Sequence, residues 1–154
     1  MNLFYFVLEL VFVYIACMGF GFIYHIRGKL LFIAPIGSSI IWAVELILKQ
    51  TDLSVVVRAF LATIAAAVFC EITARILKVP VILFMVIAIL PLVPGGGIYY
   101  TMEACIKSDY ELFVNKGIET IGIAGAIAVA MLLVSTIFRM STTAINRNKQ
   151  KKNT

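Results

Sequence analysis

Apolar residues fill this chain in runs about as long as a helix that crosses a membrane. Of the 154 residues, 62% are hydrophobic and 14% are charged, whereas a soluble domain carries about a quarter charged residues. A helix needs roughly 20 apolar residues to cross the hydrocarbon layer, and only helices or closed barrels satisfy their backbone polar groups there. Because the runs are helix-length and do not alternate as strands do, the sequence predicts an all-α polytopic membrane protein.

Five runs are predicted to cross the membrane, namely 3–24, 30–48, 53–76, 79–106 and 117–138. Their connections are short, so we expect a single transmembrane domain over 1–138, followed by a basic cytoplasmic tail over 139–154. The first run has no Lys or Arg before it and is longer than a signal-peptide core. We therefore expect it to remain as a first transmembrane helix.

Lys and Arg are distributed unequally between the two ends of the predicted spans. One end carries Arg27, Lys29, Arg75, Lys78, Arg139, Arg147, Lys149, Lys151 and Lys152, and the other carries Lys49, Lys107 and Lys116. Positively charged loops are retained in the cytoplasm, which places the amino terminus outside and requires an odd number of spans. The formal net charge of +5 is then explained by a membrane-flanking anchor, so no nucleic-acid partner is predicted.

The fourth run is interrupted by two prolines and a triple glycine. Proline lacks an N–H and clashes with the preceding turn, and glycine disfavours a regular helix, so we expect a break at Pro91, Pro94, Gly95, Gly96 and Gly97. Broken backbone at membrane depth must face protein or a watery cavity, and such helices line substrate sites in secondary transporters. A helix restarting at Gly97 would direct its N-terminal dipole at an anion. The alternative is a plain helix–loop–helix corner or a re-entrant hairpin.

Charged residues inside the spans are the second candidate feature, because a buried ion normally needs a partner or a function. Glu9 and Arg58 are the deepest, at similar distances from the outer ends of their helices and near the level of the break. They could therefore form a pair. The alternative is that Arg58 extends toward the interface while Glu9 is protonated, with neither having a role.

Other charges are spaced as helix neighbours. Glu71 and Arg75 form an i,i+4 pair near the cytoplasmic end, and we expect interfacial pairs between Glu45 and Lys49 and between Glu119 and Lys116. No nucleophile with a base and no cluster of metal ligands occurs at membrane depth. The sequence therefore predicts neither an enzyme nor a metal or cofactor site.

Small residues recur at every fourth position in the third and fifth runs, at Ala62, Ala66, Cys70 and Ala74 and at Gly122, Ala126 and Ala130. Such stripes allow helices to approach closely in lipid. They are interpreted mainly as internal packing seams, with a subunit interface as the alternative. Cys17 and Cys105, like Cys70, are expected to be small packing residues.

Two motifs resemble the small subunit of the threonine/serine exporter family. The first runs from Glu71 to Arg75 with Pro80 after it, and the second runs from Leu90 to Gly97 with Tyr100 after it. The resemblance covers essentially the whole chain. It implies half of a gradient-driven secondary exporter of amino acids or dicarboxylates in a bacterial plasma membrane, paired with a larger homologous subunit that carries a cytoplasmic domain.

The resulting hypothesis is a two-component exporter of small carboxylate-bearing solutes, such as threonine and serine or succinate. The substrate carboxylate would meet the break and its half-helix ends, with Tyr100 nearby, and the resemblance makes Glu71 the candidate for proton coupling. Two alternatives remain, a homo-oligomeric channel or passive pore and a non-transporting assembly subunit.

Overall fold

The computed structural model describes the backbone of residues 3–152 and the side chains of residues 3–141. Its elements are α1 (Leu3–Ile23), α2 (Lys29–Leu48), α3 (Val55–Leu77), α4 (Ile82–Ile89), the short 3-10 helix η1 (Leu90–Leu92), α5 (Gly95–Ile106) and α6 (Tyr110–Lys152). No strand occurs within these described residues. The predicted all-α fold is confirmed.

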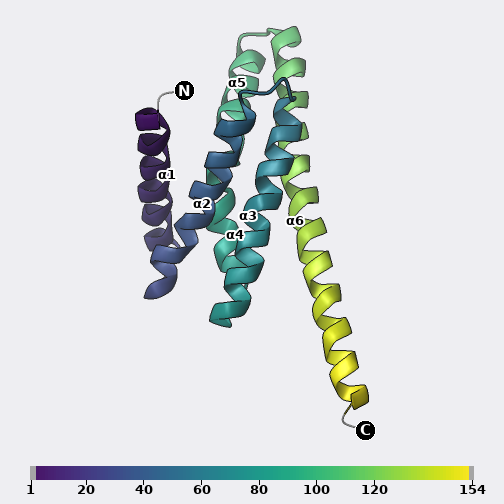
Figure 1. The fold of residues 1–154 in the computed structure, drawn as a ribbon. Helices are drawn as coiled ribbons and strands as arrows, with labels where there is room; N and C mark the ends of the chain where they lie inside the picture. Colours follow the sequence, from purple (N-terminus) through teal and green to yellow (C-terminus); the bar gives the residue numbers. More distant parts are fainter. Residues whose placement is uncertain (1–2, 153–154) are drawn as a thin grey trace.

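The helices form a bundle in which successive connections lie at alternating ends (Figure 1). Helix α1 packs on α2 at one edge, α2 packs on α3 and α4, and α3 packs on α6 at the other edge. Helix α5 packs beside the first part of α6, and the connection between these two extends beyond the α2–α3 connection. The two ends of the chain therefore lie at opposite ends of the bundle.

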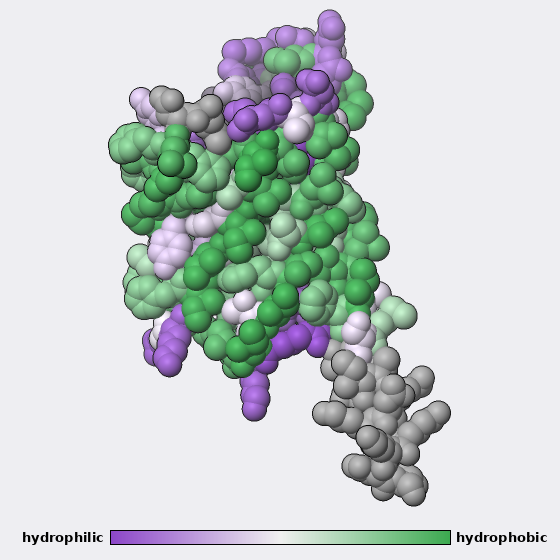
Figure 2. Space-filling view, in the orientation of Figure 1, coloured by the Kyte–Doolittle hydropathy of each residue, from purple (hydrophilic) through white to green (hydrophobic). Residues whose placement is uncertain are grey.

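Within the described residues, four single helices are long and apolar enough to cross a membrane, and a fifth span is possible if the bent pair 82–92 and 95–106 counts as one. The two parts of that pair meet at an angle of 52°, so the predicted interruption of the fourth run is confirmed. An apolar band covers the middle of the visible face, with hydrophilic residues at both ends (Figure 2). Large exposed side chains such as Phe12, Ile76 and Val129 belong to the surface that lipid would cover.

Helix α6 extends beyond the last predicted span, 117–138, at both ends. Helix α6 already begins at Tyr110, because the Asp109 carboxylate accepts a hydrogen bond from the Leu112 amide at 3.1 Å and caps the first turn. It continues through Arg139 to Lys152 without a break. The side chains of the basic tail from residue 142 onward lie outside the described residues.

The small-residue stripes lie inside the bundle, as their main interpretation predicts. Ala62, Ala66, Cys70 and Ala74 are all buried in α3, which packs on α6. A Cβ added at Gly122 of α6 would lie 3.1 Å from the Val56 side chain. Cys17 is also buried, but Cys105 is exposed on α5, so its interpretation as a packing residue is wrong.

The break after α4 depends on a hydrogen bond from α2. Pro91 cannot donate to the Ile87 carbonyl four residues earlier, so that carbonyl accepts instead from the Leu90 amide and, at 2.8 Å, from the buried Ser38 hydroxyl. Gly37 makes this approach possible, because a Cβ there would lie 2.9 Å from the Ala88 side chain. Helix α2 thus satisfies the carbonyl that the proline leaves open.

Replacing Ser38 with alanine should destabilise the bundle by about 1 kcal/mol, because a buried carbonyl loses one of its two donors. The measurement is the thermal unfolding midpoint of the purified protein in detergent. Ser39→Ala is the matched control, because the Ser39 hydroxyl makes only long contacts of 3.4 and 3.5 Å with backbone oxygens. Equal midpoints for the two variants would contradict a supporting role for Ser38.

Candidate functional site

A pocket of about 230 Å³ lies directly beside the break, and we call it the break pocket. Its walls come from α2, α3, the break itself and one residue of α6. The lining residues are Trp42, Glu45, Leu46, Lys49, Val55, Arg58, Ala59, Pro91, Leu92, Pro94 and Ile123. Arg58 and the two prolines therefore share one level of the bundle, as their depths predicted.

Arg58 pairs with Glu45 rather than with Glu9. The Arg58 Nε atom lies 3.3 Å from Glu45 Oε1, and the expected Glu9–Arg58 pair is wrong. Glu9 instead accepts a hydrogen bond of 3.0 Å from the Trp42 indole N–H. The reason is the packing order, because α2 lies between α1 and α3. Trp42 of α2 therefore contacts Glu9 on one side, and Glu45 of α2 contacts Arg58 on the other.

The pair at the break pocket retains unused hydrogen-bonding capacity. Arg58 Nε and Glu45 Oε2 are buried and have no hydrogen-bond partner among the described residues, although Nε is in ion-pair range of the other carboxylate oxygen. A buried polar atom left unsatisfied costs about 1–3 kcal/mol. The pocket is therefore prepared for a polar ligand or for water.

The glycine half of the break lies on the exterior of the chain. Gly95 and Gly96 are exposed at the start of α5, and Tyr100 is 54% exposed. None of the three lines the break pocket. Gly97 is partly buried, and a Cβ there would collide with the Thr120 hydroxyl of α6, so this glycine allows α5 and α6 to pack closely.

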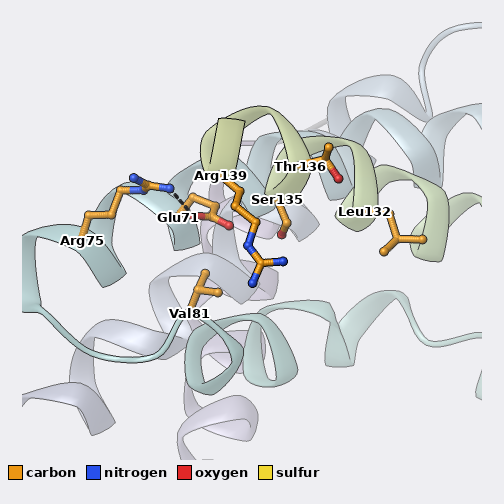
Figure 3. Close-up of a pocket in the computed structure, with 7 residues that line it drawn as sticks. All are labelled: Glu71, Arg75, Val81, Leu132, Ser135, Thr136 and Arg139. Carbon is orange, nitrogen blue, oxygen red and sulfur yellow. Dashed lines mark hydrogen bonds and ion pairs between the residues drawn. The ribbon is translucent and has the colours of Figure 1, made fainter. Parts of the chain in front are cut away.

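A second pocket of about 490 Å³ lies at the other end of α3, between α3, the start of α4 and α6, and we call it the charged pocket. It is lined by Glu71, Arg75, Val81, Leu132, Ser135, Thr136 and Arg139 (Figure 3). Here the predicted i,i+4 pair is confirmed, with Arg75 Nη2 at 3.4 Å from Glu71 Oε2. Glu71 is only 6% exposed, and the Arg75 guanidinium lies 5.2 Å from the centre of the Phe138 ring.

The α6 side of the charged pocket was not predicted. Leu132, Ser135, Thr136 and Arg139 recur at helical spacing and so lie on one face of α6. The signal was present in the sequence as three polar residues on one stripe of an apolar helix. It was missed because the predicted span ended before Arg139.

The two expected interfacial pairs have different outcomes. Lys116 Nζ lies 2.8 Å from Glu119 Oε2, which confirms that pair. The ion pair of Glu45 within the described residues is with Arg58, so the expected pair with Lys49 is wrong. Glu45 faces α3 because α2 packs against that helix.

Long apolar helices and an interrupted span define a multi-span helical membrane protein. The family model described as "Threonine/Serine exporter, ThrE" matches residues 9–137. The chain therefore belongs to the threonine/serine exporter family, and its role is transport of the type that this family carries out. No curated protein and no solved structure matches the chain.

Replacing Glu45 with glutamine should destabilise the bundle by about 1–3 kcal/mol, because the partly buried Arg58 would lose its counter-charge. Glu9→Gln is the matched control and should cost less than about 1 kcal/mol, since its hydrogen bond to Trp42 is exposed. Double-mutant cycles with Arg58→Met, followed by unfolding in detergent, measure both couplings. A larger coupling of Arg58 to Glu9 than to Glu45 would contradict the assignment.

Proposed function

We propose that this chain is one half of a two-component secondary exporter of small carboxylate-bearing solutes, threonine and serine or a dicarboxylate such as succinate. The other half is a larger homologous membrane subunit with a cytoplasmic domain. An ion gradient drives export across the plasma membrane, with the amino terminus of this chain outside and its carboxyl terminus in the cytoplasm.

The observation that carries this proposal is the exposed start of α5. Pro94 provides no side-chain cap, and the first-turn amides of a helix have no partner within the helix. Gly95 donates to the Val93 carbonyl at 2.7 Å, but Gly96 and Gly97 follow it in the first turn of α5. Such amides do not face lipid in membrane proteins; they face another protein surface or a watery cavity. A partner half that covers this surface encloses a cavity at the break.

In this proposal the solute binds between the two halves. Its carboxylate meets the dipole at the start of α5 from one side, and Arg58 across the prolines supplies the nearest cation of the break pocket. Tyr100 lies one turn further along the exposed side of α5. Glu9 holds Trp42 in the wall of the same pocket.

Proton coupling is assigned to the charged pocket at the opposite end. Glu71 is buried beside Arg75. Protonation of Glu71 would therefore remove the negative charge of this ion pair inside the pocket, instead of changing an exposed surface charge. Five spans per half also give two halves of opposite orientation, the arrangement that supports alternating access in secondary transporters. This chain is then inactive without its partner.

The double substitution Pro94→Ala with Gly96→Ala should lower efflux of labelled solute at least tenfold, because it removes the proline that precedes α5 and adds a methyl group at its exposed first turn. The measurement is efflux from cells that produce this chain with its larger subunit, with membrane insertion checked by immunoblot. Gly96→Ala alone keeps the proline, and its Cβ would meet only Tyr100, at 4.0 Å. Because the added methyl group fits without a clash, a loss of efflux in the Gly96→Ala protein would reflect a disturbed contact at the exposed break and not a failure to fold.

Gly125→Ala is the matched control, because Gly125 is also exposed and a Cβ there has no atom within 4 Å. It should keep normal efflux. Normal efflux from a well-inserted Pro94→Ala, Gly96→Ala protein would contradict the site.

Reconstitution in liposomes separates this proposal from the alternatives. Flux should require both subunits and an imposed proton gradient. Flux through this chain alone without a gradient would identify a homo-oligomeric channel. Absence of flux with both subunits and a gradient would favour an assembly subunit.

A further inference from the structure

We propose that the charged pocket is a cytoplasmic-end binding site for a small α-amino acid, in which Arg139 binds the carboxylate and Glu71 binds the ammonium group. This inference rests on the proposed function and locates a binding site for the amino acids among its solutes. It also adds Ser135, Thr136 and Arg139 to the transport site.

The charges of the pocket are arranged as a zwitterion requires. Figure 3 shows the Arg139 side chain entering the pocket from α6 beside Glu71 of α3. Arg75 lies on the other side of Glu71, at 3.4 Å. A guanidinium binds a carboxylate through two parallel hydrogen bonds, and a carboxylate is the natural partner of an ammonium group. Both complementary groups therefore line one space of about 490 Å³.

Two hydroxyls lie on the same wall. Ser135 and Thr136 line the pocket one turn before Arg139 on α6. A hydroxyl both donates and accepts hydrogen bonds, so these residues match a solute that itself carries a side-chain hydroxyl. The remaining lining residues, Val81 and Leu132, are apolar and suit a short aliphatic part.

Glu71 argues against the other anionic ligands. It is almost fully buried, and a like charge brought into a water-poor site is strongly disfavoured. A dicarboxylate or a phospholipid headgroup without an amine offers Glu71 no ammonium group, and a second anionic group would have to be met by Arg75, which already pairs with Glu71. An amino acid brings its own cation to the same position.

The charged pocket is separate from the break pocket. Arg58 and Glu71 lie on the same helix, about 20 Å apart along its axis. Between them lies the seam of buried small residues that includes Ala62, Ala66 and Cys70. The two pockets thus occupy opposite ends of α3, with a packed barrier between them.

The test is equilibrium binding of radiolabelled threonine to the purified two-subunit complex, with no ion gradient present, so that coupling does not enter. Arg139→Gln should weaken threonine binding at least tenfold, and Arg139→Lys, which keeps the charge but not the paired hydrogen bonds, should weaken it less. Glu71→Gln should weaken threonine binding and strengthen competition by succinate. Ser135→Ala with Thr136→Val should weaken binding of threonine more than binding of alanine.

Lys78→Gln is the matched control, because Lys78 is a cation at the same end of the bundle that does not line the pocket, and its threonine affinity should match that of the unmodified complex. Threonine affinities are compared only among variants whose thermal unfolding midpoint equals that of the unmodified complex. Wild-type affinity in both Arg139→Gln and Glu71→Gln would overturn the site. Succinate that binds more tightly than threonine, or threonine displaced by phosphatidylglycerol vesicles but not by serine, would overturn the substrate class.

Failure of this inference and failure of the proposed function give different results. If substitutions in the charged pocket leave threonine binding unchanged while efflux still requires Pro94 and Gly96, the amino-acid site is wrong and the proposed exporter function still holds. If efflux is independent of the break, the proposed function itself fails.

Discussion

Hydrogen bonding of the backbone at the interrupted span is the constraint on which this structure depends. Within a membrane, a backbone carbonyl or amide that lacks a protein partner has no water with which to form a hydrogen bond. The carbonyl that Pro91 leaves open is satisfied by Ser38, and that contact requires Gly37 to admit α4 against α2. The amides on the other side of the break remain at the exterior. The chain therefore satisfies the α4 side of the break by itself.

Helix α3 organises the charged sites around this break. It packs against both α2 and α6 through small residues, so its two charged ends are held in fixed positions between neighbours. Arg58 meets Glu45 at one end, and Arg75 meets Glu71 at the other. Both pairs line a pocket, with Arg58 and Glu45 14% and 16% exposed and Arg75 41% exposed.

The sequence predicted the local features well because each has a local cause. The helix lengths follow from apolar runs, the break follows from Pro91 and Pro94, and the Glu71–Arg75 pair follows from helical spacing. The partner of Arg58 could not be predicted, because helix depth does not reveal which helix stands between two others. The α6 wall of the charged pocket, formed by Arg139, Ser135 and Thr136, was not predicted, because Arg139 was placed in the tail and the two hydroxyls lie inside an apolar run.

Apolar runs, prolines and charge spacing alone determined that this chain is an interrupted bundle of membrane helices, since the bilayer leaves a sequence few ways to satisfy its backbone. The tertiary structure decided which charges meet, because helix order and the close contacts at Gly37 and Gly97 select one packing among several. It also decided that Pro94 faces a pocket while Gly96 faces outward. Such facing depends on the rotation of each helix against its neighbours, which hydropathy does not specify.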